Sequence, residues 1–342
     1  MHAVRIHKHG GPEVLQLDEI DPPHAAPREV TVAVKACALN HLDLWVRKGL
    51  PNVKIEMPRI LGSDISGVVI ETGPGVTDVP VGEEVVLQPG LSCGRCLRCQ
   101  QGRDNECRQY KILGSQVDGG YTESLSVPVE NLLPKPKRLS FEEAASVPLV
   151  FLTAWHMLVD RARLRPGEDV LVLAAGSGVG IAAIQIAKLY RARVIATAST
   201  DAKLAKAREL GADDIINYRA QDFAQKVRRL TDKKGVEVVI DHVGKDTFGK
   251  SVASLARGGR LVTCGATSGP GVDLDLRYVF ARHLSLLGSH MGGKHELAGL
   301  LPFFDTGALK PVVDRVFSLE EAADAHRRLE NREQFGKIVL RI

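Results

Sequence analysis

The sequence predicts an α/β protein with two domains, a mostly β domain followed by a doubly wound parallel sheet. Residues 1–150 contain short β-branched or alternating segments interrupted by glycine and proline, as in a sheet of short strands. From about residue 167, strand-like and helix-like segments alternate, as in a doubly wound sheet. The chain has 342 residues, of which 44% are apolar and 25% charged, a composition normal for a globular protein with a large core.

The expected elements follow in chain order. In the first half, strands are expected over 3–7, 30–37, 66–73 and 83–90. In the second half, strands are expected over 169–175, 193–199, 214–218, 236–243 and 259–266, and helices over 181–192, 201–212, 222–232 and 251–256. A last strand over 337–342 is expected to return to the first domain. An exposed sheet edge is expected near 259–266.

The charge pattern indicates a small-molecule partner rather than a polymer or a membrane. The formal net charge is only +4, and acidic and basic residues are mixed along the chain, so no basic stripe indicates nucleic acid or a lipid surface. No run of about 18 apolar residues occurs, and the first residues lack the apolar core of a signal peptide. Cys37 and Cys264 suit a reducing compartment, so a cytoplasmic location is expected.

Four cysteines lie close together with the spacing C-x2-C-x2-C-x7-C: Cys93, Cys96, Cys99 and Cys107. Two-residue spacers and a glycine-bearing loop let a short segment place four thiolates in a tetrahedron around zinc. Because no ligand position stays open, such a site is structural rather than catalytic. The alternatives are disulfides or free thiols, and an iron–sulfur cluster, whose common spacings differ from this one.

A glycine-containing turn follows the expected strand 169–175 and opens the helix after it. A dinucleotide site needs small residues here, because the backbone approaches the pyrophosphate and the helix N-terminus faces it. The candidate cofactor residues are Ala175, Gly176, Ser177, Gly178, Val179 and Gly180. Ala175 and Ser177 depart from G-x-G-x-x-G, while Gly180 fills its third position. The alternative is an ordinary tight turn between strand and helix.

The end of the second strand of this unit favours NADP(H) over NAD(H). A carboxylate at this strand end would bind the ribose 2′-hydroxyl of NAD, and residues 197–200 contain none. Ser199, Lys203 and Tyr218 could instead bind the 2′-phosphate of NADP. Asp201 speaks against this assignment, although a carboxylate at a helix start also favours the helix dipole. Lys203 could equally be a solvated helix residue.

Several segments resemble the medium-chain dehydrogenase/reductase superfamily, the zinc-containing alcohol dehydrogenases and quinone oxidoreductases. They are ACALNHLDLWVRKG, MPRILGSDISGVVIETG, the four-cysteine segment, AAGSGVGIAAIQIAK, ELGADDIINY and the closing GKIVL. The resemblance implies a GroES-like, mostly β catalytic domain over 1–150 with a zinc lobe at 90–110, a Rossmann cofactor domain over 151–287, and a return over 288–342. It also implies hydride transfer in the cleft between the two domains.

The sequence departs from the family at the catalytic zinc, which alcohol dehydrogenases hold with a cysteine, the histidine of Gly-His-Glu and a second cysteine. Asn40, Ser63 and Leu149 stand at these positions, Asp64 replaces the glutamate, and Leu42 replaces the hydroxyl residue of the proton relay. Leucine cannot bind zinc, so an intact Lewis-acid site is not expected. A makeshift metal site stays open on ligand chemistry, built from Cys37, His41, Asp43 and Asp64.

The pattern of Asn40, His41 and Asp43, together with Ser199, Lys203 and Tyr218, resembles the quinone oxidoreductase branch, in which hydride transfer needs no metal. The candidate catalytic residues are Asn40, His41 and Asp43. The Asn40 amide could stabilise the enolate oxygen, and His41 could donate the proton, although water could serve and His41 could equally contact cofactor phosphates. Asp43 is expected to orient Asn40 or nearby backbone.

The resemblance also implies further cofactor contacts and an oligomer. Thr153 is placed near the nicotinamide, and Gly265, Ala266, Ser289 and His290 lie in segments whose backbone holds the carboxamide. A homodimer or homotetramer is expected, because the family pairs Rossmann sheets edge to edge.

The sequence therefore predicts an NAD(P)H-dependent reductase that acts on quinones, enones or related activated alkenes without a catalytic zinc. Two alternatives stay open: an alcohol dehydrogenase with an atypical catalytic metal, and a dinucleotide-binding protein without catalytic activity.

Overall fold

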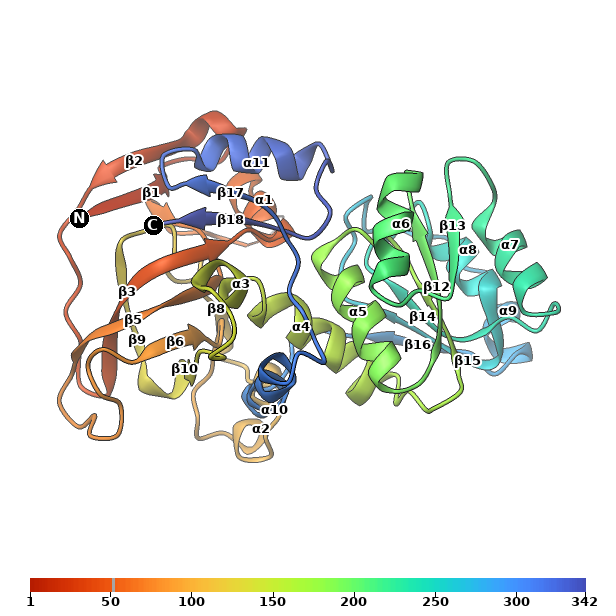
Figure 1. Ribbon diagram of the computed structural model, residues 1–342, viewed down its shortest axis with the longest axis horizontal. Helices are drawn as coiled ribbons and strands as arrows, with labels where there is room; N and C mark the ends of the chain where they lie inside the picture. Colours follow the sequence, from red (N-terminus) through yellow and green to blue (C-terminus); the bar gives the residue numbers. More distant parts are fainter. Residues whose placement is uncertain (51–52) are drawn as a thin grey trace. The chain divides into compact units, whose positions relative to one another are not determined.

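The computed structural model describes residues 1–50 and 53–342, which form two compact units (Figure 1). The first unit comprises Met1–Leu149 and Gly293–Ile342, and the second comprises Val150–Gly292. The first unit is therefore discontinuous in sequence and surrounds the second along the chain. Within the described ranges, no helix combines the length and apolar character that crossing a membrane requires.

The first unit is mostly β, as expected. Its strands are β1 (His2–Ile6), β2 (Leu15–Glu19), β3 (Glu29–Ala38), β4 (Arg59–Ile60), β5 (Asp64–Thr72), β6 (Glu84–Leu87), β7 (Gly90–Leu91), β8 (Lys111–Ile112), β9 (Ser124–Pro128), β10 (Leu132–Pro134), β17 (Val313–Ser318) and β18 (Lys337–Arg341). Its α-helices are α1 (His41–Lys48), α2 (Leu97–Gln100), α3 (Phe141–Ala145), α10 (Lys294–Asp305) and α11 (Ala322–Glu330). Alternating apolar residues such as Val30, Val32 and Val34 on β3 are buried in its core.

The main sheet of the first unit has the order β10-β6-β5-β3-β18-β17, and β9 also pairs with β3. The strand β18 runs antiparallel to β3, with Val339 opposite Ala38, and Asp64 on β5 also lies opposite Ala38. The returning strand therefore brings the last residues of the chain beside the ends of β3 and β5. This pairing positions the candidate catalytic residues.

Helix α1 is not among the elements expected from the sequence. Asn40 is its N-cap, and Asp43, three residues on, returns a side-chain oxygen to the backbone N–H of Asn40. This contact is one half of a capping box, and it satisfies a backbone N–H at the start of the helix. The candidate catalytic residues therefore lie at the start of a helix.

The second unit contains a parallel six-stranded sheet with the order β13-β12-β11-β14-β15-β16. Its strands are β11 (Asp169–Val172), β12 (Arg193–Ala198), β13 (Asp214–Asn217), β14 (Val236–Asp241), β15 (Leu255–Thr263) and β16 (Ser285–Gly288). Its α-helices are α5 (Gly178–Leu189), α6 (Asp201–Glu209), α7 (Phe223–Leu230), α8 (Phe248–Ser254) and α9 (Leu276–Ala281); α4 (Pro148–Trp155) enters the unit and continues as a π-helical segment over His156–Arg161. In chain order the strands lie 3-2-1-4-5-6, the Rossmann arrangement.

The second unit differs from the sequence prediction in several details, since β16, α4 and α9 are not among the expected elements. The helix expected over 251–256 ends at Ser254, because Leu255 and Ala256 already belong to β15. The prediction of an exposed sheet edge near 259–266 is wrong, because β15 pairs with both β14 and β16. The edge strand on this side is β16.

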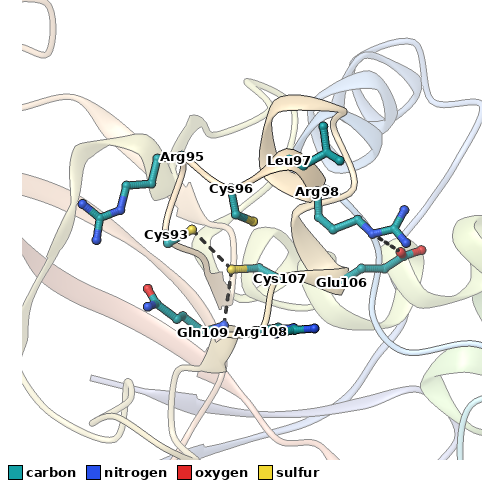
Figure 2. Close-up of a pocket in the computed structure, with 9 residues that line it drawn as sticks. All are labelled: Cys93, Arg95, Cys96, Leu97, Arg98, Glu106, Cys107, Arg108 and Gln109. Atoms are coloured by element: carbon teal, nitrogen blue, oxygen red, sulfur yellow. Dashed lines mark hydrogen bonds and ion pairs between the residues drawn. The ribbon is translucent and has the colours of Figure 1, made fainter.

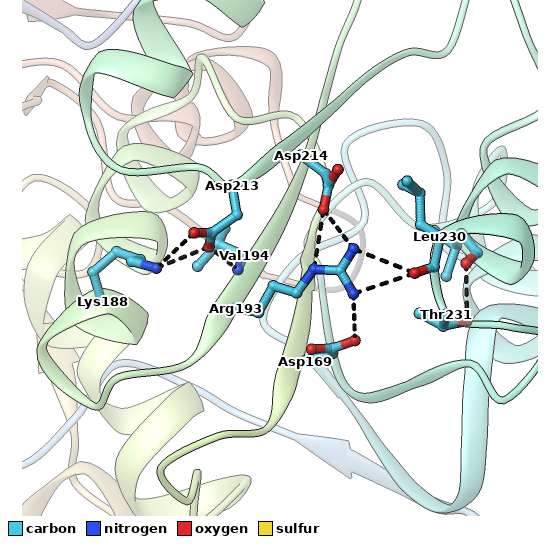
Figure 3. A network of polar contacts seen from close by, with 9 residues as sticks. Asp169, Lys188, Arg193, Val194, Asp213, Asp214, Leu230 and Thr231 are labelled. Atoms are coloured by element: carbon cyan, nitrogen blue, oxygen red, sulfur yellow. Dashed lines mark hydrogen bonds and ion pairs between the residues drawn. The ribbon is translucent and has the colours of Figure 1, made fainter.

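Arg193 connects the amino-terminal ends of three parallel strands in the second unit (Figure 3). Its guanidinium lies 2.7 Å from Asp214 on β13 and 3.2 Å from Asp169 on β11, and it donates to the carbonyl of Leu230 at the end of α7. Burial raises the pKa of Asp169 although Arg193 opposes the shift. Arg193 therefore fixes the register of these strands at the end of the sheet away from the glycine-containing turn.

Replacing Arg193 with methionine is expected to lower the free energy of unfolding by about 1 kcal/mol, and by less at high salt. The effect is modest because the Arg193 side chain is 37% exposed. Urea unfolding at low and high ionic strength measures it, with Arg219→Met as the control on an exposed arginine. Equal losses in both variants would contradict the role given to Arg193.

Candidate functional site

Three buried polar side chains meet where β3, β5 and β18 end in the first unit. Lys337 Nζ lies 2.8 Å from Asp64 Oδ2 and 2.6 Å from Asn40 Oδ1, and Asn40 Nδ2 donates to Asp64 Oδ2 at 3.0 Å. Lys337 is 4% exposed, Asp64 0% and Asn40 6%. We call these three residues the lysine cluster. Each pair within it is in direct contact, so an ammonium ion is held beside the helix start that carries the candidate catalytic residues.

Both carboxylate oxygens of Asp64 have hydrogen-bond partners. Oδ2 binds Lys337 and Asn40, and Oδ1 accepts a hydrogen bond of 2.7 Å from the backbone N–H of Leu149. A buried carboxylate is stable only when it is paired and hydrogen bonded, and both oxygens of Asp64 meet this condition. The Asp64–Lys337 ion pair therefore has a rigid anchor.

The contacts of the lysine cluster compete with the metal site that the sequence left as an alternative. The oxygens of Asn40 and Asp64 that a cation would need already bind the Lys337 ammonium, and a second positive charge there would be repelled. Ser63 donates its hydroxyl to the carbonyl of Leu113 at 2.7 Å. The donor set at this place therefore fits an ammonium ion better than a metal ion.

Asp43 lies beneath the lysine cluster and is fully buried. Its carboxylate accepts hydrogen bonds from the backbone N–H groups of Asn40 (2.6 Å) and Gly62 (3.1 Å). Burial raises the pKa of Asp43 to about 6, although these hydrogen bonds and Lys337 oppose the shift. Asp43 thus contacts the backbone of Asn40. His41, the first residue of α1, is partly exposed and packs edge-to-face against Trp45.

The four cysteines of the expected cage gather in one segment of the first unit, and Figure 2 shows three of them, Cys93, Cys96 and Cys107. Their sulfur atoms all lie within 4.8 Å of one another, with 3.5 Å between Cys96 and Cys99, 3.5 Å between Cys107 and Cys93, and 3.9 Å between Cys93 and Cys99. A zinc–sulfur distance near 2.3 Å requires sulfur atoms about 3.8 Å apart, so the spacing fits zinc and is too long for disulfides.

Backbone N–H groups around the cage favour the thiolate of Cys93, whereas burial raises the pKa of Cys99 to about 11. The backbone N–H of Gln109 donates to the Cys107 sulfur at 3.4 Å. Backbone N–H groups of Arg95 and Cys96 lower the pKa of Cys93 to about 6. In Figure 2 the Arg95 and Arg98 side chains point away from the sulfurs. Cys93, Cys96, Cys99 and Cys107 are the only group of three or more potential metal ligands found among the described residues.

The glycine-containing turn joins β11 to α5 in the second unit. Ser177 is the N-cap of α5 and accepts a hydrogen bond of 3.0 Å from the backbone N–H of Gly180. A Cβ atom at Gly180 would lie 2.5 Å from the carbonyl oxygen of Ala174, so only glycine fits without movement. Residues 175–180 therefore form a tight turn whose helix N-terminus can receive a pyrophosphate.

His242 follows β14, which neighbours β11 at the point where the strand order reverses. Its Nε2 lies 2.8 Å from Ser177 Oγ, and burial lowers the pKa of His242, which favours the neutral form. Open α/β sheets bind ligands at this switch point. His242 is not among the residues predicted from the sequence, since only the fold brings it to the glycine-containing turn.

The residues expected to choose the nucleotide lie at the ends of β12 and β13. Ser199 and Lys203 are partly exposed, and Tyr218 is 42% exposed with its backbone N–H bound to the carbonyl of Ala198. Asp201 accepts a hydrogen bond of 2.8 Å from the Asn217 side chain. This contact occupies one oxygen of the carboxylate that speaks against NADP.

The remaining candidates lie on the same unit. Thr153 is buried in α4. Gly265 and Ala266 follow β15, and Ser289 and His290 follow β16; the backbone N–H of Ser289 donates to the carbonyl of Thr263 at 2.8 Å. Because parallel strands end at one edge of a sheet, these two segments share the edge that carries the glycine-containing turn.

Lys337, which completes the lysine cluster, is not among the residues predicted from the sequence. The residue opens β18, directly before the apolar residues 338–340, and lies 297 positions from Asn40. A lysine before an apolar run is usually solvated, so the only available signal was its place in the returning strand.

Two family models match the chain. The alcohol dehydrogenase GroES-like domain matches residues 26–137, and the zinc-binding dehydrogenase domain matches residues 178–306. The first match lies in the first unit, and the second begins at α5.

Solved structures and characterised enzymes match essentially the whole chain. A solved NAD-dependent alcohol dehydrogenase is 53% identical with a TM-score of 0.97 and covers 100% of both chains. The 2-haloacrylate reductase of a Burkholderia species is 34% identical over 99% of this chain and 98% of the relative, and the NAD-dependent alcohol dehydrogenase of Sulfolobus acidocaldarius is 32% identical over 100% of both. The chain belongs to the medium-chain dehydrogenase/reductase superfamily and is an NAD(P)-dependent oxidoreductase.

Proposed function

We propose that the protein reduces quinones, enones or related activated alkenes with NADPH and without a catalytic zinc. The lysine cluster carries this proposal, because an ammonium ion bound to Asn40 and Asp64 stands where the family's catalytic metal would need ligands. The named 2-haloacrylate reductase, whose substrate is an activated alkene, supports the same reaction class.

The ammonium group of Lys337 can act on a substrate oxygen. Two of its three N–H bonds point to Asn40 and Asp64, which leaves one donor for the negative charge that gathers on a carbonyl oxygen during reduction. The Asn40 amide donates to Asp64 instead, so we assign Asn40 the task of orienting Lys337. When bound, the reduced nicotinamide supplies the hydride to the β-carbon.

Reduction also needs a proton at the carbon next to the carbonyl. His41 is the candidate donor in the first unit, since imidazole titrates near neutral pH and the residue is partly exposed. Asp43 is bound to two backbone N–H groups and is better placed to fix the helix start than to move protons.

A turnover panel tests this function. Quinones, enones and a 2-haloacrylate are compared with primary and secondary alcohols, each with NADPH and NADH. Faster reduction of the activated alkenes or quinones is the expected result. Faster oxidation of alcohols would favour the alternative suggested by the named alcohol dehydrogenases, and no turnover of any substrate would favour a binding protein.

We propose that the protein prefers NADP(H), with Ser199, Lys203 and Tyr218 binding the 2′-phosphate. Replacing Lys203 with alanine is expected to weaken NADPH binding by about 10-fold and to leave NADH unchanged, because only NADPH carries the 2′-phosphate. Fluorescence titration of both cofactors measures the effect, with Lys206→Ala on the same helix as the control. A loss that is equal for NADPH and NADH would count against the assignment.

The other parts of the proposal concern metal, location and assembly. We propose that the cysteine cage binds one structural zinc and that the protein is cytoplasmic. We assign the catalytic residues to the first unit and the cofactor site to the second. A homodimer or homotetramer is proposed through the edge strand β16 and the neighbouring helix α9, on which Leu276 and Phe280 are 67% and 69% exposed. Sedimentation analysis measures the assembly.

A further inference from the structure

A histidine and a serine meet at the start of α5 in the second unit. His242 follows β14, and its Nε2 atom lies 2.8 Å from Ser177 Oγ, the side-chain oxygen of the α5 N-cap. His242 is only 8% exposed, and its other ring nitrogen, Nδ1, is buried without a hydrogen-bond partner among the described residues. A buried polar atom without a partner is costly and rare in folded proteins, which indicates that this ring does more than pack.

Neighbouring contacts fix the position of His242 without using its ring. The carboxylate of the preceding residue, Asp241, accepts hydrogen bonds from donors that follow it in the chain: the backbone N–H groups of Val243 and Gly244 and the hydroxyls of Thr247 and Ser251. The Thr267 hydroxyl donates to the carbonyl of His242 at 3.4 Å. Both oxygens of Asp241 are therefore occupied, and Ser177 Oγ is the only hydrogen-bond partner of the imidazole among the described residues.

The Ser177–His242 pair has one hydrogen more than the protein has acceptors for it. Ser177 Oγ already accepts the backbone N–H of Gly180 at 3.0 Å. A hydroxyl has one hydrogen and two lone pairs, and a neutral imidazole has one N–H. If Nε2 carries the ring proton, it donates to Ser177 and the serine hydrogen stays free. If Nδ1 carries the proton, the serine donates to Nε2 and the Nδ1–H stays free.

Burial favours the tautomer with the proton on Nε2. The Nδ1 atom is closed off from solvent, and buried donors without a partner are rarer than buried acceptors without one. Ser177 is partly exposed, so a ligand can reach its hydroxyl hydrogen. Burial also lowers the pKa of His242, which keeps the ring neutral. The pair therefore presents a free hydroxyl hydrogen at the N-terminus of a helix of 12 residues.

We propose that the Ser177 hydroxyl, oriented by His242, donates a hydrogen bond to a pyrophosphate oxygen of the dinucleotide, which makes His242 a positioning residue of the cofactor site. Ser177 stands at the place where the G-x-G-x-x-G motif has a glycine that lets the backbone approach the pyrophosphate, and a helix N-terminus favours an anion. The inference rests on the proposed function only in that the cofactor binds in the second unit. It is independent of the substrate and of the preference between NADPH and NADH.

Cofactor binding in the absence of substrate tests the role of Ser177. Ser177→Gly restores the glycine of the motif and removes the hydroxyl, and glycine is tolerated at helix N-caps. The variant should bind NADPH and NADH about 10-fold more weakly, and to the same extent, because both carry the pyrophosphate. Lys203→Ala, in contrast, should affect NADPH alone. Fluorescence titration measures both dinucleotides.

Two competitors and one control variant locate the contact. ADP, which carries the pyrophosphate, should lose as much affinity for Ser177→Gly as NADH does, and adenosine should lose none. Ser140→Gly removes the serine N-cap of α3 in the first unit and should leave all these affinities unchanged. Equal losses for adenosine and ADP, or wild-type binding of NADH by Ser177→Gly, would overturn the inference. A failure of the proposed substrate class would leave these binding results unaffected.

The role of His242 is tested by its dependence on Ser177. His242→Ala should weaken both cofactors by about 3-fold in the wild type and should have no further effect in the Ser177→Gly background, because it acts through the hydroxyl. His242→Gln keeps an amide donor and should retain more affinity than alanine. Nitrogen NMR of the imidazole should show the proton on Nε2. Equal effects of His242→Ala in both backgrounds, or a proton on Nδ1, would contradict the role given to His242.

Discussion

Replacing Lys337 with methionine is expected to lower kcat for an enone by about 100- to 1000-fold, the usual effect of removing a donor to a developing oxyanion. The ammonium group is held 2.6 Å from Asn40 Oδ1 and 2.8 Å from Asp64 Oδ2, so it needs no reorganisation when charge develops on the substrate. The KM for cofactor should change little. Steady-state kinetics with NADPH and an enone measure the effect.

A control must separate catalysis from stability in this variant. Methionine at position 337 leaves the buried Asp64 carboxylate without its cation, which by itself costs about 3–5 kcal/mol. The double variant Asp64→Asn, Lys337→Met removes both charges and should recover stability without recovering kcat. Lys337→Arg keeps the positive charge and should fall between the wild type and methionine. A folded double variant with kcat within threefold of the wild type would show that Lys337 has no electrostatic role.

Replacing Cys107 with serine is expected to remove zinc and to lower the unfolding temperature of the first unit by about 5–15 °C. When bound, the ion cross-links four positions of one loop, and a ligand present at 100 to 1000 times its Kd stabilises the folded state by about 3–4 kcal/mol. Cys107 is the one buried member of the cage and lies 3.5 Å from Cys93. Calorimetry and metal analysis of the same samples measure both effects.

The matched control is Cys264→Ser, which lies in the second unit and outside the cage. It should keep one zinc per chain and the wild-type unfolding temperature of the first unit. Because the cage has four thiolates and no open position, Cys107→Ser should retain kcat per folded molecule. A variant that keeps its unfolding temperature but loses all turnover would indicate a catalytic metal instead.

Local sequence patterns predicted most of the fold. The strand–turn–helix alternation after residue 167 predicted five of the six strands of the Rossmann sheet, all except β16, and the spacing of Cys93 to Cys107 predicted that these cysteines gather, because both signals act between near neighbours. Helix α1 was missed even though Asn40 and Asp43 have the spacing of a capping box, since β-like segments surround it.

The centre of the candidate site could not be predicted in the same way. Lys337 meets Asn40 only because β18 pairs with β3, and this pairing joins residues almost 300 positions apart. Such contacts have no periodicity or spacing by which a single sequence could reveal them.

The most direct test of the central proposal is an anomalous diffraction experiment at the zinc edge on crystals of a catalytically competent preparation. The proposal predicts one peak per chain, among the sulfurs of Cys93, Cys96, Cys99 and Cys107, and none beside the lysine cluster. A second peak bound to Asn40 or Asp64, with Lys337 displaced, would contradict it.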